Sequence, residues 1–520
     1  MVPARGAVVA VVLSMAVLAG CSGSTDEHPA APTTVEVAPN QVAGVALPED
    51  AVDKAVGRLD ELIGSLMDSS HIPGMAVAVV HGGKTVYAKG FGVREAGAPD
   101  KVDADTVFQL ASVSKSLAAT VVADQVGAGT VDWSTPVTTH LPAFALADPA
   151  VTAQLTVGDL FAHRSGLPDH AGDRLEDLGY DRAAILEKLR LEPLDPFRIT
   201  YQYTNFGLTA GAESVAVAAG KEWARLSQDS VYGPLGMTST SSRFDDFRAR
   251  PNHAVGHVNV DGTWSARYER DPDPQSPAGG ASSSVNDMAR WLTMLLGEGT
   301  PVAPPEALLP ALSPQVVSTP PQNLDARAGN YGYGFNVSVS PAGRTTVSHS
   351  GAFALGAATN FLVIPSADVA IVALTNAAPL GIPETLTAEF ADLVQFGEIR
   401  EDWRGLYRAA FADMDAPEGD LAGQQAPSNP APAQPLTAYA GTYDSAYWGP
   451  ATIATTDTGL QLTLGPAQRA YPLRHWDGDT FAFEPSGENA PPGSVSSVRF
   501  ADGAVTIDYF DESGLGTFTR

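Results

Sequence analysis

The sequence predicts an α+β fold, with one antiparallel sheet flanked by helices and a small all-β domain at the C-terminus. Runs of apolar and β-branched residues typical of strands occur early in the chain and again far downstream, whereas the stretch between them has mostly helical and loop patterns. Strands at both ends of a helical segment indicate that sequence-distant strands close one sheet. The last part of the chain consists of short β-type runs separated by Gly, Pro and Asp, which indicates a separate β domain.

The composition is that of an acidic, folded chain. Its 520 residues include 31 Lys+Arg and 59 Asp+Glu, a formal net charge of −28 at pH 7. This argues against a nucleic-acid partner, because nucleic-acid binding depends on Lys and Arg neutralising phosphates. A hydrophobic content of 44% with 17% charged residues is typical of globular proteins. At about 150 residues per domain, the length allows roughly three domains.

Residues 1–20 have the pattern of a signal peptide. Arg5 supplies the positive charge, and the apolar stretch from Ala7 to Leu18 is shorter than the ~20 residues that span a bilayer. The sequence around Gly20-Cys21 resembles a bacterial lipoprotein signal, which implies cleavage before Cys21 and lipidation of its thiol. We expect an exported lipoprotein, anchored on the outer face of the bacterial cell membrane. The alternative is an ordinary secretory signal with an incidental cysteine.

The main domain is expected to span residues 50–410, after a flexible, Pro/Ala/Thr-rich tether at 21–49. Apolar residues at helical spacing between Val52 and Leu66 predict an opening helix, and the apolar segment Met288 to Leu296 predicts a buried one. The predicted strands are 75–80 and 85–90, which form a hairpin, and, far downstream, 345–350, 360–364 and 369–374.

A Pro/Ala-rich linker at 411–435 separates this domain from residues 436–520. The short β-type runs of 436–520 predict a small sandwich or barrel. Its aromatic residues Trp448, Trp476 and Phe483 are expected in its core rather than on a glycan-binding surface. No catalytic constellation occurs there.

Ser112 and Lys115 are the first candidates for catalysis. A serine and a lysine three residues apart at the start of a helix lie on one face, with Cβ atoms about 5–6 Å apart, so the amine can reach the hydroxyl. The apolar continuation at 117–123 indicates a buried helix, and burial disfavours the ammonium form. A neutral amine beside a serine hydroxyl is a base beside a nucleophile. A lone Ser-x-x-Lys match is too common to decide the matter.

Two further motifs follow along the chain. Tyr203-Thr204-Asn205 lies in a turn-like segment and supplies a phenol for proton transfer and an amide for hydrogen bonding. His349-Ser350-Gly351 ends a predicted strand and is followed by Ala352, whose N–H could join that of Ser112 to hold an oxyanion.

With these motifs in order, the sequence resembles the serine β-lactamase and penicillin-binding-protein superfamily, closest to its class C β-lactamase, D,D-peptidase and esterase branch. The pattern of that branch is Ser-x-x-Lys, then Tyr-x-Asn, then Lys-Thr-Gly or a His/Trp-x-Gly variant. The resemblance covers roughly residues 50–400 and implies a β-lactamase/transpeptidase-like antiparallel sheet flanked by helices. Supporting segments are 163–168, 277–280 and 331–335.

The resemblance also implies a role for each motif residue. Ser112 would be the acylated nucleophile, Lys115 its general base, and Tyr203 the acid and base that serves the leaving group and the deacylating water. The N–H groups of Ser112 and Ala352 would form the oxyanion hole, and no metal or organic cofactor would take part. The residues expected to bind substrate are Asn205, His349, Ser350, Gly351 and Ala352.

One departure from the branch concerns His349, where its β-lactamases usually carry a lysine that meets the substrate carboxylate. No lysine occurs after Lys221. A histidine with a pKa near 6.5 is mostly neutral at pH 7 and is a weaker anchor for a carboxylate. We therefore expect a small-molecule or peptide substrate, with esters and D-amino-acid amides or peptides favoured over β-lactams.

Plainer interpretations remain for these residues. Ser112 and Lys115 could be a helix cap and a solvated lysine, Tyr203-Thr204-Asn205 a turn, and His349 a structural strand residue. The leading hypothesis is an exported, lipid-anchored, monomeric serine hydrolase that acts through a Ser112 acyl-enzyme. The alternative is a non-catalytic envelope protein that retains the fold to bind cell-wall fragments or a partner protein.

Overall fold

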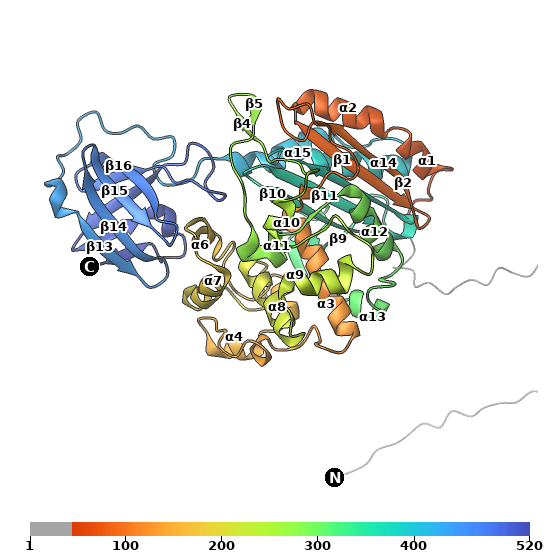
Figure 1. Ribbon diagram of the computed structural model, residues 1–520, viewed down its shortest axis with the longest axis horizontal. Helices are drawn as coiled ribbons and strands as arrows, with labels where there is room; N and C mark the ends of the chain where they lie inside the picture. Colours follow the sequence, from red (N-terminus) through yellow and green to blue (C-terminus); the bar gives the residue numbers. More distant parts are fainter. Residues whose placement is uncertain (1–43) are drawn as a thin grey trace, which may run out of the picture. The chain divides into compact units, whose positions relative to one another are not determined.

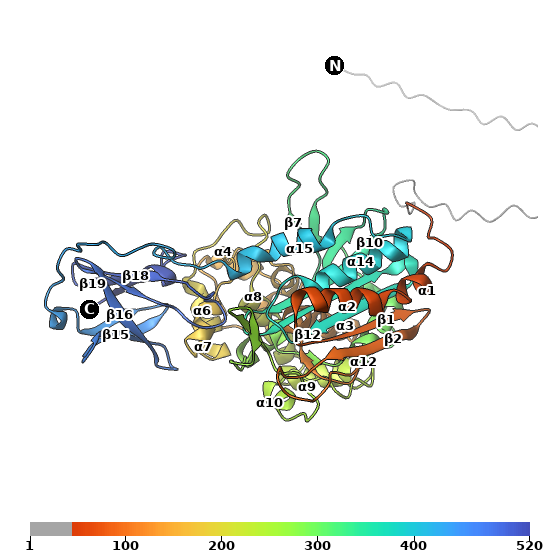
Figure 2. The same ribbon diagram turned by 90° about the horizontal axis from the view of Figure 1, so that it is seen from above.

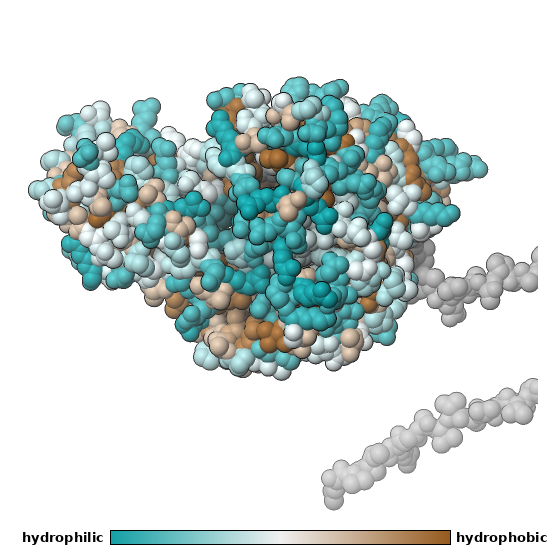
Figure 3. All heavy atoms as spheres, viewed as in Figure 1, coloured by the Kyte–Doolittle hydropathy of each residue, from teal (hydrophilic) through white to brown (hydrophobic). Residues whose placement is uncertain are grey.

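The structure, a computed structural model, describes residues 44–520, which belong to one compact unit (Figure 1). The expected signal peptide, the lipidation site at Cys21 and most of the tether lie outside the described residues. Within residues 44–520 no helix has the length and apolar character needed to cross a membrane. The face shown in Figure 3 is mostly hydrophilic, in keeping with the net charge of −28.

An eight-stranded antiparallel sheet forms the centre of the main domain. The strands of the early hairpin pair directly with strands from the other end of the domain, as the distribution of strand patterns predicts: Val77 of β1 is opposite Ala373 of β12. In sheet order the strands are β2 (Lys84–Gly92), β1 (Gly74–His81), β12 (Val369–Thr375), β11 (Ala357–Ile364), β10 (Thr345–Phe353), β9 (Asn336–Val339), β8 (Gly329–Tyr331) and β7 (Val316–Thr319).

Both faces of the sheet are covered by helices, so its central strands are buried on both sides. Successive side chains of a strand point to opposite faces, and β1 divides accordingly: Val77 and Val79 join one hydrophobic core, whereas Ala76 and Ala78 join the other. The helices over the first face are α1 (Ala51–Val56), α2 (Leu59–Ser70), α14 (Ile382–Phe396) and α15 (Trp403–Phe411), and the second face packs on α12 (Val285–Leu296) and α3 (Ser114–Gly127), as Figure 2 shows.

The opening helix and β10 differ from the sequence-based expectation in ways that bear on the site or the core, and β2 and β11 are longer than expected. The opening helix is broken into α1 and α2, because the chain turns at Gly57 and Arg58. The strand expected to end at Ser350 continues to Phe353, so Ala352 lies within β10. The second difference places Ala352 in the sheet, beside its partner Ala358 on β11.

A helical region lies between the early and late strands and carries most of the site. Its helices are α4 (Pro149–Gln154), α5 (Val157–Phe161), α6 (Asp173–Asp177), α7 (Arg182–Lys188), α8 (Asn205–Ala218), α9 (Trp223–Ser227), α10 (Phe244–Arg248), α11 (Ser276–Gly279) and α13 (Pro305–Leu308). Two small ribbons, β3 (Phe108–Gln109) with β6 (Ser282–Ser283) and β4 (Val258–Val260) with β5 (Thr263–Ser265), join its segments.

The C-terminal domain is a closed barrel, one of the two architectures that its sequence predicts. Closure comes from pairing of the first strand with the last, Asp444 with Thr519. Trp448, Trp476 and Phe483 are buried, as expected of core residues. The strands are β13 (Gly441–Ser445), β14 (Gly449–Thr456), β15 (Gly459–Leu464), β16 (Arg469–Asp477), β17 (Thr480–Phe483), β18 (Ser496–Ala501), β19 (Ala504–Ile507) and β20 (Thr517–Thr519).

The barrel shares a hydrophobic core with α6, α7 and the loop after them (Figure 1). Leu175 and Leu178 belong to the same cluster as the barrel residues Tyr447 and Trp448. Polar contacts cross the same boundary: the Ala467 N–H donates to the Leu178 carbonyl at 3.1 Å. The barrel is therefore packed onto the part of the main domain that leads into the candidate site.

We predict that Leu178→Ala destabilises the protein by about 2–5 kcal/mol, because a buried leucine loses its transfer energy and leaves a cavity. The matched control is Leu191→Ala, a nearby leucine that is 38% exposed, which is expected to change the free energy of unfolding by about 0.5 kcal/mol or less. Urea unfolding of the two variants measures the difference. Equal losses would contradict the shared core.

Candidate active site

Ser112 lies in a tight turn that opens the central helix of the domain. The turn is a 3-10 segment, η2 (Ala111–Val113), which continues into α3. Ala111, immediately before Ser112, has a φ of 45°, a left-handed conformation that costs a non-glycine residue about 1–2 kcal/mol. Strain of this kind persists only where the surroundings enforce it, and it is often found at functional sites.

The amine of Lys115 is completely buried beside the Ser112 hydroxyl. Its Nζ lies 2.9 Å from Ser112 Oγ, 2.6 Å from Asn205 Oδ1 and 3.0 Å from the Ala278 carbonyl oxygen. Burial lowers the pKa of Lys115 to about 7, although the charge of Asp173 opposes the shift. Near neutral pH the amine is therefore present in both forms.

The three partners of Lys115 fit either protonation state. Asn205 Oδ1 and the Ala278 carbonyl can only accept, so they take two N–H groups of the neutral amine and leave its lone pair directed at Ser112. The charged form donates its third N–H to Ser112 Oγ, which also accepts. A group with satisfied hydrogen bonds in both forms can take up a proton and return it without rearrangement.

Tyr203 completes the polar cluster around the serine. The Lys115 amine lies 4.5 Å from the centroid of the Tyr203 ring. Desolvation raises the pKa of Tyr203 well above its ordinary value, and the Ser112 hydroxyl opposes this shift. The group therefore stays a phenol at neutral pH. The His163 ring packs 4.5 Å away, centroid to centroid, and its Nδ1 accepts from the Thr204 N–H, which holds the tyrosine segment in place.

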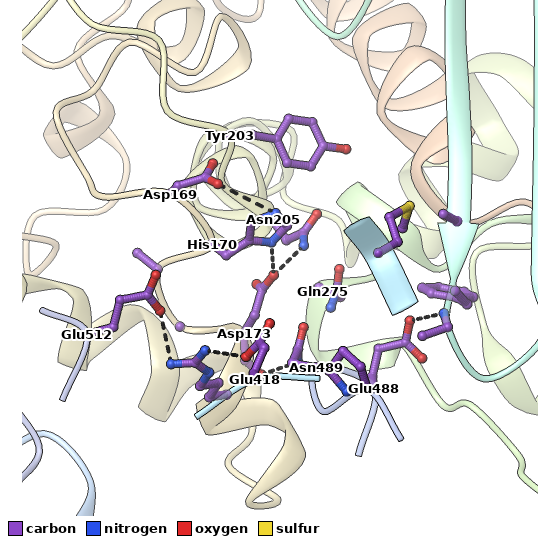
Figure 4. Close-up of a pocket in the computed structure, with 18 of the residues that line it drawn as sticks. Asp169, His170, Asp173, Tyr203, Asn205, Gln275, Glu418, Glu488, Asn489 and Glu512 are labelled. Carbon is purple, nitrogen blue, oxygen red and sulfur yellow. Dashed lines mark hydrogen bonds and ion pairs between the residues drawn. The ribbon is translucent and has the colours of Figure 1, made fainter. Parts of the chain in front are cut away.

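Two residues that sequence reasoning missed, Asp173 and His170, extend this network (Figure 4). Asp173 Oδ2 accepts hydrogen bonds from Asn205 Nδ2 and His170 Nδ1, both at 2.7 Å. The first bond fixes the amide of Asn205 so that its oxygen faces Lys115. Neither residue belongs to a recognisable motif, because only the packing of the loop before α6 against the start of α8 brings them to the site.

Strand β10 passes directly beside the η2 turn that carries Ser112. A Cβ atom on Gly351 would lie 2.2 Å from the Leu110 carbonyl oxygen and 3.0 Å from the Ser112 nitrogen, so only glycine permits this approach. Thr359 Oγ1 donates to the same Leu110 carbonyl at 2.7 Å and ties β11 to the turn. Ser350 and Ala352, on either side of Gly351, line the cleft together with Ser112.

His349 does not line the cavity, although the sequence places it among the substrate-binding residues. Its ring is buried, with Nε2 2.8 Å from the Tyr331 hydroxyl and Nδ1 2.6 Å from the Ser350 carbonyl. Desolvation, with a smaller effect from the charge of Lys115, lowers the pKa of His349 to about 3. The ring is thus neutral at physiological pH and presents no positive charge to a substrate carboxylate.

The cleft is a cavity of about 610 Å³ that the two domains line together. The main domain contributes Ser112, Tyr203 and Asn205, and the barrel contributes aromatic and acidic residues. Glu488 of the barrel accepts hydrogen bonds from the backbone N–H groups of Ala354 at 2.7 Å and Leu355 at 3.2 Å, just after β10 (Figure 4). The barrel therefore contacts the chain just after the strand that borders Ser112.

Two family models match the chain. The one described as Beta-lactamase matches residues 59–395, more than half of the chain. The chain belongs to the Beta-lactamase family. A domain of unknown function, DUF3471, matches residues 425–510 and so covers most of the barrel that follows the Beta-lactamase region.

Similar proteins include named hydrolases and penicillin-binding proteins. "Unguisins hydrolase ungD'" of Aspergillus campestris is 29% identical over 422 residues, 78% of each chain. "Penicillin-binding protein 4" of Amycolatopsis lactamdurans is 29% identical over 328 residues, 61% of this chain and 84% of its own. The octameric penicillin-binding protein homologue from Pyrococcus abyssi matches with a TM-score of 0.59 at 19% identity, over 87% of this chain and 98% of that one, which shows a shared fold. These matches support a serine hydrolase of this Beta-lactamase family.

We predict that the rings of His349 and His170 titrate far apart. His349 stays neutral down to about pH 3. Burial lowers the pKa of His170, but its hydrogen bond to Asp173 and the charges of Asp173 and Asp169 outweigh this effect and raise the pKa to about 9. The measurement is ¹⁵N NMR of histidine-labelled protein, with His349→Gln and His170→Gln to assign the two signals. A His349 midpoint between pH 6 and 7 would contradict the buried, neutral ring.

Proposed function

We propose that the protein is an exported, lipid-anchored hydrolase that cleaves esters and D-amino-acid amides or peptides through an acyl-enzyme on Ser112. The observation that carries the proposal is the contact of 2.9 Å between Ser112 Oγ and a fully buried Lys115 amine whose pKa is lowered to about 7. The amine is basic enough to accept a proton and is neutral in a large fraction of molecules at pH 7.

In the acylation step, neutral Lys115 takes the Ser112 proton as Oγ attacks the substrate carbonyl. The N–H groups of Ser112 and Ala352 are the donors for the developing oxyanion, because β10 lies against the nucleophile turn. The Tyr203 phenol then gives its proton to the leaving group and is reprotonated by the Lys115 ammonium. The step ends with both groups neutral and the acyl group on Ser112.

Deacylation runs the same proton path in reverse. Water attacks the acyl carbonyl while its proton passes by way of Tyr203 to Lys115, and the proton finally returns to Ser112 Oγ. The high pKa of Tyr203 means that a free phenolate does not accumulate, so the transfers through Tyr203 and Lys115 are coupled. Asn205, held by Asp173, keeps the amine oriented throughout.

The preference for esters and amides over β-lactams is supported by the missing carboxylate anchor. The chain has no lysine after Lys221, and the neutral ring of His349 faces Tyr331 rather than the cavity. Hydrolase activity is also compatible with the name of the relative from Aspergillus campestris, an unguisins hydrolase. Export and lipid anchoring are supported by the sequence pattern that ends at Cys21.

We predict that a fluorophosphonate probe forms a covalent adduct on Ser112, found by mass spectrometry, because an activated serine attacks the phosphorus as it attacks a carbonyl. Ser112→Ala is expected to lose nitrophenyl esterase activity by on the order of 10³-fold or more. The control is Ser134→Ala, which changes an exposed serine that does not line the cavity. This variant should retain both the adduct on Ser112 and the esterase activity. An adduct elsewhere, or full activity in Ser112→Ala, would contradict the proposal.

The substrate preference is tested with the same preparations. Short-chain nitrophenyl esters, D-alanyl anilides and a chromogenic cephalosporin are compared by kcat/KM. The proposal expects turnover of the first two and the lowest value for the cephalosporin. A cephalosporin turned over faster than both would overturn the assignment of substrate class while leaving Ser112 as the nucleophile.

A further inference from the structure

The cationic side chains that line the cavity are already paired with carboxylates. Arg174 lies 3.0 Å from Glu418 and 3.0 Å from Glu512. Arg270 pairs with Glu176 at 2.5 Å and lies 3.8 Å from Glu488. Each arginine thus faces two acidic groups, although Arg270 Nε has no hydrogen-bond partner among the described residues.

His170, the remaining cationic group that lines the cavity, also lies close to two carboxylates. Its Nδ1 is 2.7 Å from Asp173, and its Nε2 is 3.9 Å from Asp169. Seven acidic residues and two arginines line the cavity. Glu176, which pairs with Arg270, is not one of the seven. Acidic groups therefore outnumber cationic groups at the cavity, although burial raises the pKa of Glu488 to about 7 and also raises the pKa of Asp169.

Two buried carboxylate oxygens at this cavity have no hydrogen-bond partner among residues 44–520. They are Glu192 Oε2 and Asp173 Oδ1, and the two residues are only 4% and 3% exposed. Both residues line the cavity. A buried carboxylate oxygen without a donor costs free energy, so such a group is normally satisfied by a partner, which a bound molecule can supply.

The aromatic residue Tyr447 of the barrel lines the same cavity and interacts with Glu192. Desolvation raises the pKa of Glu192, whereas the hydroxyls of Tyr447 and Ser513 lower it. The charges of Glu192 and Asp173 in turn add to desolvation in raising the pKa of Tyr447. Tyr447 and the neighbouring Trp448 both line the cavity. Carboxylates combined with aromatic rings are the surroundings in which proteins bind ammonium groups.

We propose that Glu192 and Asp173, walled by Tyr447 of the barrel, form a subsite for a primary ammonium group of the substrate. The inference deepens the proposed function, on which it rests, by naming the substrate class: amides or peptides with a free, positively charged amine. The position of Asp173 supports this, because it is linked to the nucleophile through Asn205 and Lys115 by contacts of 2.7, 2.6 and 2.9 Å.

The subsite also gives the barrel a function. Tyr447, Ser513 and Glu512 come from the C-terminal domain, whereas Glu192 and Asp173 come from the main domain. Recognition of the amine would therefore require both domains. The hydrophobic core that the barrel shares with α6 and α7 would fix the position of one domain against the other. A cation bound here would also keep Glu192 ionised despite its burial.

The test compares two anilides with the full protein at pH 7: D-alanine p-nitroanilide, which carries an ammonium group, and propionic acid p-nitroanilide, which has hydrogen in its place. We expect Glu192→Gln to reduce the ratio of their kcat/KM values by about ten- to a hundredfold, as expected for a hydrogen bond to a charged group. Comparing the ratio between enzyme forms cancels the intrinsic reactivity of the anilides. Glu187→Gln, which removes an exposed glutamate from the preceding helix, is the matched control and should keep the wild-type ratio.

A second measurement needs no variant. D-alaninamide is expected to protect Ser112 of the wild-type protein from the fluorophosphonate at about tenfold or more lower concentration than propionamide. Equal protection by the two amides, or an unchanged ratio in a folded Glu192→Gln variant, would overturn the subsite. Labelling of Ser112 separates the two proposals: labelling without amine preference refutes only the subsite, and absence of labelling refutes the proposed function and the subsite together.

Discussion

The contact between a buried amine and a serine hydroxyl is the interaction on which the site depends. Lys115 is fully buried, and its three polar contacts come from three separate segments: the η2 turn, the start of α8 and α11. An unsatisfied amine at this depth would be costly, so these segments must converge correctly for the domain to be stable. The geometry that satisfies the lysine also directs its lone pair at the Ser112 hydroxyl.

The rest of the structure maintains this convergence. Gly351 allows β10 to touch the turn that carries Ser112, and Asp173 fixes the amide of Asn205. The barrel contributes through Glu488, which accepts from the backbone just beyond β10, and through the core that it shares with α6 and α7. The domain that lies last in the sequence thus lines the same cavity as Ser112, which lies early in the chain.

The sequence could predict those features that depend on local spacing. The fold class is confirmed, since strand patterns at both ends of the main domain pair in one sheet. Ser112 and Lys115 are three residues apart, so any helical turn brings them together, and Tyr203 and Asn205 are brought to the same cluster. The break between α1 and α2 at Gly57 interrupts an otherwise regular apolar pattern and was not evident from it.

Features that depend on tertiary packing could not be predicted. His349 has the same motif position whether its ring points to the cavity or to Tyr331, and only the structure places it against Tyr331. Asp173, His170 and Glu192 lie in loops and short helices without periodicity, and their importance comes from what surrounds them. Closure of the barrel likewise depends on one pairing, Asp444 with Thr519, between strands at its two ends.

The most direct test is the ionisation of Lys115 itself, measured by ¹³C NMR of protein labelled at lysine Cε. The groups that surround the amine are Asp173, Tyr203, His163 and His349, and burial outweighs the attraction of Asp173. Of the seven lysines in the chain, one signal should titrate near pH 7 and be absent from Lys115→Arg. If every lysine signal titrates above pH 9, the amine is a fixed cation and cannot serve as the base for Ser112.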